Sequence, residues 1–265
     1  MTVQDLLRHT AGLTYEFLEP ATPVREAYSR ADIASPSLDS EAHARALAQL
    51  PLMHEPGSVW EYSRATDVVG RLIEVMSGET LGSHLERVVF RPLGMPDTGF
   101  HVPVEKHARM AESFPTEPDG TAIVLSDPRS PVALESGGGG LQSTAADYAR
   151  FLSMLLNGGT LDGVRLLGRK TVQHMTSDHL GNIPISGDLL PPGHGFGLGF
   201  AVRLVTGVAA LPGSVGTYGW GGIAGTLFFV NPKEEMFALM MIQAPGQRVE
   251  IQERFRTMVY AALDG

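Results

Sequence analysis

The chain has 265 residues and a mass of 28.4 kDa, of which 43% of residues are hydrophobic and 18% are charged. This composition excludes an intrinsically disordered chain and allows a sizeable buried core. A net charge of −9 and the lack of any Lys/Arg run argue against a nucleic-acid partner. The chain has no cysteine, which excludes disulfides, thiolate catalysis and zinc–sulfur sites.

Apolar residues at helical spacing, together with capping residues, predict several helices in the first 160 residues. These are expected at 2–7 with Thr2 and Asp5 as a capping pair, 38–50, 63–77 with Ser63 as the cap, 80–91 between Thr80 and Pro92, and 143–156 with Ser143 as the cap. Turn-forming composition predicts irregular segments at 19–36 and 94–135. The four glycines 137–140 are expected to form a turn.

The last third of the chain changes character. Strand-like segments occur at 196–205, 225–230 and 236–242, and the last two are separated by a five-residue hairpin loop. A terminal helix is expected to bury one stripe of its residues, namely Val249, Ile251, Phe255, Met258, Val259 and Ala262. Helices followed by antiparallel strands predict an α+β fold in one domain over 1–265, with 1–195 mainly helix and loop and 196–265 antiparallel strands and a C-terminal helix. A sheet of three strands is small for a chain of this length.

No segment of the sequence indicates a membrane. The apolar run 236–242 is too short to cross a bilayer, and the first five residues lack the basic and apolar regions of a secretory signal. We therefore expect a soluble protein, cytoplasmic by default, although an export signal upstream of Met1 would not be visible in this sequence.

Two segments suggest chemistry. Tyr62 lies just before a predicted helix, where a tyrosine can act as a general base if a nearby cation lowers its pKa. Trp220-Gly221-Gly222 precedes a predicted strand, where glycines let a substrate approach the backbone and leave an N–H free for an oxyanion. Taken alone, each feature is more often structural: a half-buried aromatic before a helix, and a tight turn or bulge.

The sequence gives little support for a metal site or a cofactor site. The nine histidines include no His-Glu-x-x-His motif, and no Gly-Lys-Ser/Thr follows the four glycines, so no phosphate-binding loop is indicated. We expect neither a metal nor a cofactor.

The order of several short motifs resembles the serine β-lactamase and penicillin-binding-protein superfamily, and most closely its family VIII carboxylesterase branch. The motifs are Gln4-Asp5-Leu6-Leu7-Arg8-His9-Thr10-Ala11-Gly12-Leu13, Glu55-Pro56-Gly57 with Trp60-Glu61-Tyr62-Ser63, Gly138-Gly139-Gly140-Leu141 with Ser143-Thr144-Ala145, and Trp220-Gly221-Gly222. The resemblance implies an antiparallel sheet flanked by helices, plus a mostly helical region. It also implies that Tyr62 passes a proton between nucleophile and leaving group, and that Trp220, Gly221, Gly222 and Ile223 form the opposite wall, with one oxyanion N–H from Ile223.

In the superfamily the nucleophile is the serine of a Ser-x-x-Lys motif. The residues three before Lys106, Lys170 and Lys233 are proline, leucine and valine, so the motif occurs nowhere in this sequence. The resemblance therefore implies that the nucleophile helix and the first strands of the sheet are missing. We interpret this as an N-terminal truncation or a misplaced start codon, with a natural fragment or a subunit that works with another chain as alternatives.

The expected function of the intact parent is hydrolysis of short-chain carboxylic esters through an acyl-enzyme, with a small-molecule ester as substrate. Arg64 stands where penicillin-binding relatives have asparagine, and Trp220 where they have lysine, which favours a simple ester over an antibiotic or peptide. A β-lactamase, a D-alanyl-D-alanine peptidase and a non-catalytic binding module of the same fold remain as alternatives. This chain by itself is expected to be inactive, and an exposed sheet edge is expected to cause self-association.

Overall fold

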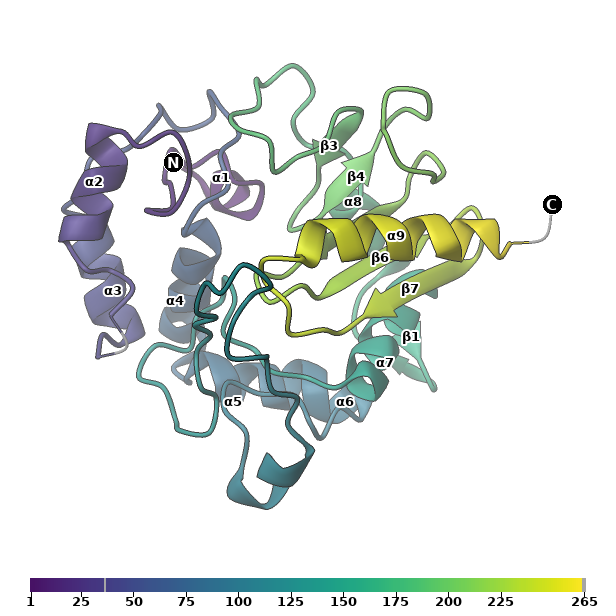
Figure 1. Ribbon diagram of the computed structural model, residues 1–265, viewed down its shortest axis with the longest axis horizontal. Helices are drawn as coiled ribbons and strands as arrows, with labels where there is room; N and C mark the ends of the chain where they lie inside the picture. Colours follow the sequence, from purple (N-terminus) through teal and green to yellow (C-terminus); the bar gives the residue numbers. More distant parts are fainter. Residues whose placement is uncertain (36, 264–265) are drawn as a thin grey trace.

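A five-stranded antiparallel sheet forms the centre of the computed structural model, which describes residues 1–35 and 37–263 (Figure 1). Pro36, part of the predicted loop 19–36, lies outside the described residues. The strands follow one another across the sheet in chain order: β3 (His194–Phe196), β4 (Ala201–Arg203), β5 (Tyr218–Gly221), β6 (Leu227–Asn231) and β7 (Met236–Met240). This α+β arrangement confirms the predicted fold class.

The sheet has two strands more than the sequence analysis counted. The predicted strand 196–205 is a hairpin of β3 and β4, because Gly199, with φ of 96°, reverses the chain between them. Trp220 and Gly221, which were predicted to precede a strand, form the second half of β5, which pairs with β6. The β6–β7 hairpin was predicted correctly.

Helices cover both faces of the sheet. Successive side chains of β6 point to opposite faces, so neighbouring residues of this strand contact different helices. Phe228 packs against Tyr148 of α7 (Ala145–Leu156), with 5.4 Å between the ring centroids. Phe229 stacks on Tyr260 of α9 (Arg248–Ala261) and lies beneath the guanidinium of Arg256. In Figure 1, α9 crosses in front of β6 and β7.

The predicted buried stripe of α9 is correct only in part: none of its residues is fully buried, but Ile251, Phe255 and Val259 are half-buried. Val249 and Met258, two members of that stripe, are 59% and 71% exposed. The contacts with the sheet come instead from longer, partly polar side chains, for example the Gln252 amide, which donates to the carbonyl oxygens of Gly225 and Thr226. Apolar spacing thus identified part of the packed face, and its polar members were not predicted.

The helical region precedes the sheet in the chain and consists of α1 (Val3–Leu7), α2 (Pro23–Arg30), α3 (Ser40–Leu47), α4 (Ala65–Ser77) and α5 (Leu81–Leu85). The predicted capping pair at the start of α1 is confirmed as a full capping box of Thr2 and Asp5. The prediction of a loop at 19–36 is wrong, because Thr22 caps α2 and Pro23 occupies its first position, where a missing N–H costs nothing.

Three predicted helix boundaries are corrected by the structure. Ser63 does not cap α4, which begins at Ala65 without a side-chain cap. Thr144 rather than Ser143 caps α7. The helical segment that starts at Thr80 continues past Pro92, through a π-helical turn (Glu86–Phe90) and α6 (Arg91–Leu93), and ends at Gly94.

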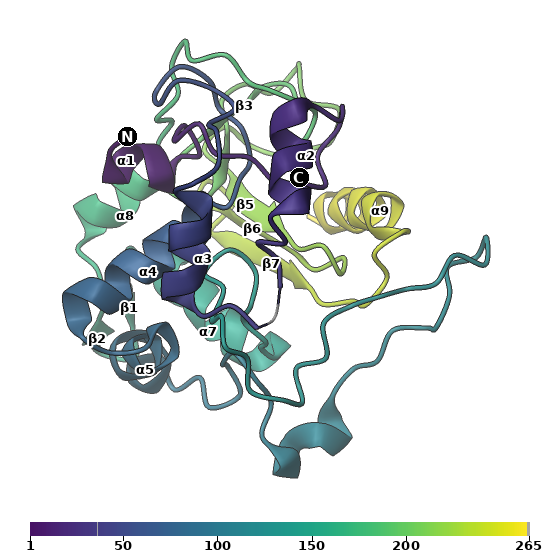
Figure 2. The same cartoon turned by 90° about the vertical axis from the view of Figure 1, so that its left-hand side faces the viewer.

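Short elements complete the fold. They are a 3-10 helix η2 (Val104–Arg109), the small hairpin of β1 (Thr160–Leu161) and β2 (Val164–Arg165), and α8 (Arg169–Met175). The segment 94–135 is otherwise irregular, as predicted, and projects far from the body of the molecule (Figure 2). Among the described residues, no helix combines the length and apolar character needed to cross a bilayer.

Candidate active site

The structure brings Tyr62 and Trp220 into direct contact. Tyr62 lies in the extended segment just before α4, and Trp220 lies on β5. The Trp220 Nε1–H donates a hydrogen bond to Tyr62 Oη at 3.4 Å, and the ring centroids are 5.1 Å apart. The two residues that the sequence predicted for opposite walls of a site therefore lie side by side.

The Tyr62 phenol is protonated at neutral pH in this arrangement. Burial raises its pKa above the ordinary value of a tyrosine, and the negative charge of Asp67 adds to this effect. The hydrogen bond from Trp220 acts in the opposite direction, because it stabilises the phenolate. A general-base role for Tyr62 thus requires a cation close to the phenol.

The turn after Trp220 needs glycine for steric reasons. A Cβ atom at Gly222 would lie 2.3 Å from Thr226 Oγ1, and the Gly222 N–H donates to the Thr226 carbonyl oxygen at 2.8 Å. Ile223 is 63% exposed, and its N–H has no acceptor among the described residues. An unpaired N–H at Ile223 is what the predicted oxyanion role requires, and that role stays a prediction.

Behind Tyr62 lies a buried histidine that sequence reasoning did not single out. The His9 ring lies 4.8 Å from the Tyr62 ring, and its Nδ1 lies 3.3 Å from Ser63 Oγ. Burial lowers the pKa of His9 to about 3, so the imidazole is neutral. The backbone of His9 adopts φ of 57°, a left-handed conformation that is uncommon outside glycine. His9 fixes the buried side of the site, and the fully buried Ser63 is its partner rather than a helix cap.

Glu61 connects the segment before Tyr62 to three other parts of the chain. Its carboxylate accepts from Thr14 Oγ1 and from Arg25 of α2 at 3.0 Å, and His54 Nε2 lies 2.8 Å from its second oxygen. Burial alone would raise the pKa of Glu61, but these hydrogen bonds hold it below its usual range. The ion pair between Glu61 and Arg25 is almost completely buried and fixes the backbone that presents Tyr62.

Asp67 on α4 holds the four-glycine turn against the helix. Its Oδ1 accepts from Ser136 Oγ at 2.5 Å and from the Gly138 N–H at 3.1 Å. A Cβ at Gly138 would lie 2.9 Å from Tyr15 Oη, so this turn passes close to the aromatic residues around Tyr62.

A groove with a volume of about 1060 Å³ opens beside Trp220. It lies between the sheet, α7, the α5–η1 segment, the glycine turn and the irregular segment 97–129, and its lining is mostly apolar. Residues from these elements include Gly138, Tyr148, Trp220, Gly221, Phe228 and Leu239. The groove is large enough for a segment of polypeptide as well as for a small ligand.

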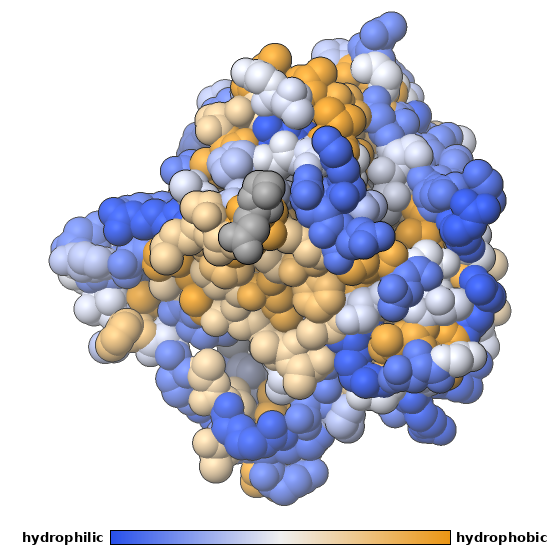
Figure 3. Space-filling view, turned by 90° about the vertical axis from the view of Figure 1, so that its right-hand side faces the viewer, coloured by the Kyte–Doolittle hydropathy of each residue, from blue (hydrophilic) through white to orange (hydrophobic). Residues whose placement is uncertain are grey.

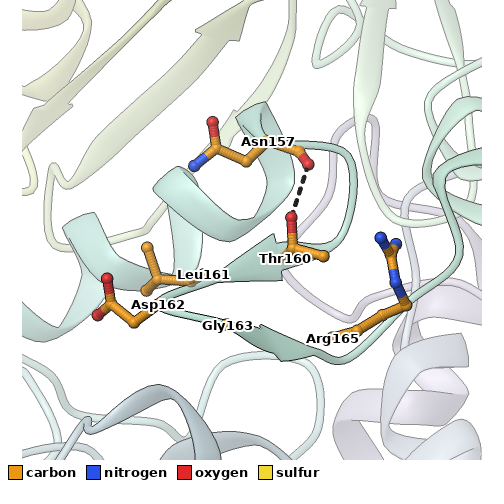
Figure 4. A pocket seen from close by; sticks show the side chains of 6 residues that line it. All are labelled: Asn157, Thr160, Leu161, Asp162, Gly163 and Arg165. Carbon is orange, nitrogen blue, oxygen red and sulfur yellow. Dashed lines mark hydrogen bonds between the residues drawn. The ribbon is translucent and has the colours of Figure 1, made fainter.

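A second depression, on the β1–β2 hairpin, has no catalytic features (Figure 4). The Thr160 hydroxyl donates to the Asn157 carbonyl oxygen there, and Asp162 and Arg165 lie at its rim. The described part of the chain contains no group of three or more His, Asp or Glu side chains arranged to hold a metal ion.

The chain matches the sequence profile of the Beta-lactamase family over residues 1–262. It is 36% identical over 253 residues to Protein Rv1367c of Mycobacterium tuberculosis, covering 91% of this chain and 62% of that protein. It is 30% identical over 282 residues to Esterase EstB of Burkholderia gladioli, covering 98% of this chain and 70% of EstB. The chain thus spans about three fifths to seven tenths of the length of these relatives.

Solved structures agree with the sequence comparisons. EstCE1, described as a hydrolase with promiscuous acyltransferase activity, superposes with a TM-score of 0.81 at 28% identity, covering 98% of this chain and 72% of EstCE1. A further relative found by sequence is a putative D-alanyl-D-alanine carboxypeptidase of Escherichia coli, which is 26% identical over 273 residues, covering 94% of this chain and 58% of that protein. The profile match over nearly the whole chain and the likeness to EstB show that this chain belongs to the beta-lactamase family.

Proposed function

We propose that this chain forms part of a serine hydrolase that cleaves short-chain carboxylic esters through an acyl-enzyme. The observation that carries the proposal is the hydrogen bond from Trp220 Nε1 to Tyr62 Oη, beside an open apolar groove. The attacking serine hydroxyl and a lysine would come from a Ser-x-x-Lys segment outside these 265 residues, which contain no such motif. The groove has room for such a segment.

In the proposed reaction, the serine oxygen attacks the ester carbonyl carbon while Tyr62 Oη takes the serine proton. The Ile223 N–H donates to the oxyanion that forms on the carbonyl oxygen. Collapse of this intermediate breaks the bond to the alcohol, which leaves with the proton from Tyr62. Water then hydrolyses the acyl-enzyme by the same steps in reverse order. The neighbouring lysine would supply the cation that Tyr62 needs to act as a base.

The choice of a simple ester rests on two residues. Arg64 occupies the position of an asparagine in penicillin-binding relatives, and its guanidinium pairs with Glu16 instead of facing a substrate amide. Trp220 occupies the position of a lysine and donates to Tyr62 instead of binding a substrate carboxylate. Both groups that would recognise a β-lactam or peptide are therefore replaced.

The test compares two proteins: the 265-residue chain and the same chain extended by its upstream reading frame. We expect the extended protein, if it supplies Ser-x-x-Lys, to hydrolyse 4-nitrophenyl butyrate and not a chromogenic cephalosporin. Tyr62→Phe in the extended protein should lower kcat by about 10² to 10⁴-fold. The 265-residue chain should retain only about 10³-fold acceleration over water. Cephalosporin turnover would favour the β-lactamase alternative, and a stop codon upstream would favour a binding module.

A further inference from the structure

An irregular arm, residues 97–129, forms one wall of the groove. Its base is anchored by two backbone hydrogen bonds between Gly99 and Gln142, at 2.7 and 3.0 Å. Side chains of both its outgoing run and its returning run line the groove, and the guanidinium of Arg129 on the returning run pairs with Glu112 on the outgoing run. The two runs are thus joined to each other, and the arm faces the sheet across the groove.

The tip of the arm is a tight turn that fixes the position of Glu117. Thr116 and Ala122 form an antiparallel bridge across this turn. The Glu117 N–H donates to the Thr121 carbonyl oxygen at 2.8 Å, and the Glu117 carbonyl oxygen accepts from the Gly120 N–H at 2.9 Å. Gly120 adopts φ of 88°, a conformation that residues with side chains rarely adopt. The backbone of Glu117 is therefore held by its own turn.

Glu117 binds the main chain just before α9. Its Oε1 accepts a hydrogen bond from the Gly246 N–H at 2.6 Å, and Figure 1 shows the tip of the arm beside the start of this helix. A Cβ atom at position 246 would lie 2.5 Å from the Glu117 carboxylate carbon, so this close approach requires glycine. The other carboxylate oxygen, Oε2, is buried and has no partner among the described residues. The charge-assisted hydrogen bond from Gly246 therefore forms a latch between the tip of the arm and the body of the molecule.

The segment that Glu117 binds also holds the turn that carries the candidate oxyanion donor. Two residues before Gly246, the Ala244 N–H donates to the Ala224 carbonyl oxygen at 2.7 Å. Ala224 directly follows Ile223, whose N–H is the donor expected for the oxyanion. Six residues after Gly246, the Gln252 amide of α9 donates to two backbone carbonyl oxygens of the same turn. The position of Gly246 is therefore coupled to the turn from both sides.

We propose that the arm is a strap over the groove and that its latch, the contact of Glu117 with Gly246, regulates the candidate site. With the latch closed, the arm covers one side of the groove, and segment 244–246 holds the turn that presents the Ile223 N–H. Release of the latch opens the groove and loosens this turn at the same time, so access and oxyanion binding change together. The inference rests on the proposed function for the role of Ile223 and adds a means of regulation. Glu117 is a positioning residue, because it acts on the turn through Gly246.

Amide hydrogen exchange of the 265-residue chain, measured by NMR, tests the latch without any turnover. The reporters are the N–H groups of Gly222, Gly225 and Ala244, each of which donates within the turn or to it. We expect Glu117→Ala to speed their exchange by about 3- to 10-fold, the factor that corresponds to the loss of one hydrogen bond. Gly246→Ala should have the same effect, because its methyl group displaces the Glu117 carboxylate.

The controls separate the latch from a general loss of charge or stability. Glu105→Ala removes an exposed acidic residue of the same arm that has no ion pair or side-chain hydrogen bond among the described residues, so it should leave the reporters unchanged. Glu117→Gln keeps an acceptor oxygen and should retain most of the protection. The Gly78 N–H, which donates to the Glu74 carbonyl oxygen at the end of α4, should exchange at its original rate in every variant.

The double variant Glu117→Ala/Gly246→Ala decides whether the two residues act through one contact. If they do, its reporters should exchange no faster than those of either single variant. Additive effects, unchanged exchange of the turn in Glu117→Ala, an equal effect of Glu105→Ala, or equal acceleration at Gly78 would overturn the proposal. Hydrolysis plays no part in these measurements, so an inactive extended protein would contradict the proposed esterase function and leave the result for the latch unaffected.

Discussion

The Trp220 indole N–H donates to the Tyr62 hydroxyl oxygen across 158 positions of sequence. This hydrogen bond joins the sheet to the segment before α4 and fixes the phenol beside the groove. It also favours the phenolate form, against the effect of burial on the Tyr62 pKa. Trp220 is thus an electrostatic partner of Tyr62 as well as a wall of the site.

Trp220→Phe should raise the pKa of Tyr62 further, because the phenolate loses its donor while burial remains. The measurement is an alkaline absorbance titration of tyrosinate, in which the Tyr62 contribution is obtained by subtracting the curve of Tyr62→Phe. Ile223→Ala, a change to an exposed neighbour, serves as the control and should leave the curve unaltered. An identical Tyr62 titration in Trp220→Phe and the original chain would contradict the role assigned to the hydrogen bond.

His9 should make the protein less stable as the pH falls below the pKa of an unfolded histidine, about 6.5. The folded-state pKa of about 3 means that the unfolded chain binds the proton first, so stability is complete above pH 6.5 and is lost toward pH 3. The slope is about 1.4 kcal/mol per pH unit, or about 2 kcal/mol between pH 6.5 and 5.

Urea unfolding of the original chain and of His9→Asn at pH 7 and pH 5 checks this expectation. Asparagine tolerates the left-handed backbone of position 9, so the variant removes the titrating group with little backbone strain. We expect His9→Asn to lose about 2 kcal/mol less between the two pH values. Equal losses in the two proteins would show that His9 does not remain neutral in the folded state.

Arg25→Met should destabilise the protein by about 3–5 kcal/mol, because it leaves the Glu61 carboxylate buried without its cation. Arg45→Met removes an exposed ion pair with Glu41 and should cost less than about 1 kcal/mol. The double variant Arg25→Met/Glu61→Leu should recover part of the lost stability, since no unpaired charge remains. Urea unfolding measures the stability of all three variants. If Arg25→Met lost no more stability than Arg45→Met, the ion pair of Glu61 and Arg25 would not stabilise the fold as stated.

Self-association through the sheet edge remains a prediction. β7 is the last strand in the sheet, so its outer edge has no partner among the described strands. The face turned toward the viewer in Figure 3 has an apolar centre bordered by hydrophilic residues. We expect two copies to pair at this edge at micromolar concentrations. Met240→Lys, at the end of β7, should weaken the association, whereas Met76→Lys on α4 should not. Sedimentation of a monomer at high micromolar concentration would count against the prediction.

Local signals in the sequence determined several elements correctly. The Thr2–Asp5 capping box, the Thr80 cap and the β6–β7 hairpin all depend on interactions between residues close in the chain. The order of the motifs likewise identified the family, because each motif is a short contiguous segment. Tyr62 and the Trp220 turn could be named as site residues for the same reason.

Tertiary structure decided which neighbours these residues have. Ser63 had the right type and place for a helix cap, but it is buried against His9, from a segment more than fifty residues away. The four-residue β5 depends on pairing with β6. The contacts of Glu61 with Arg25 and of Glu117 with Gly246 arise only when separate segments fold together. Sequence patterns specify local conformation and residue chemistry, whereas burial, long-range hydrogen bonds and ring stacking depend on the completed packing.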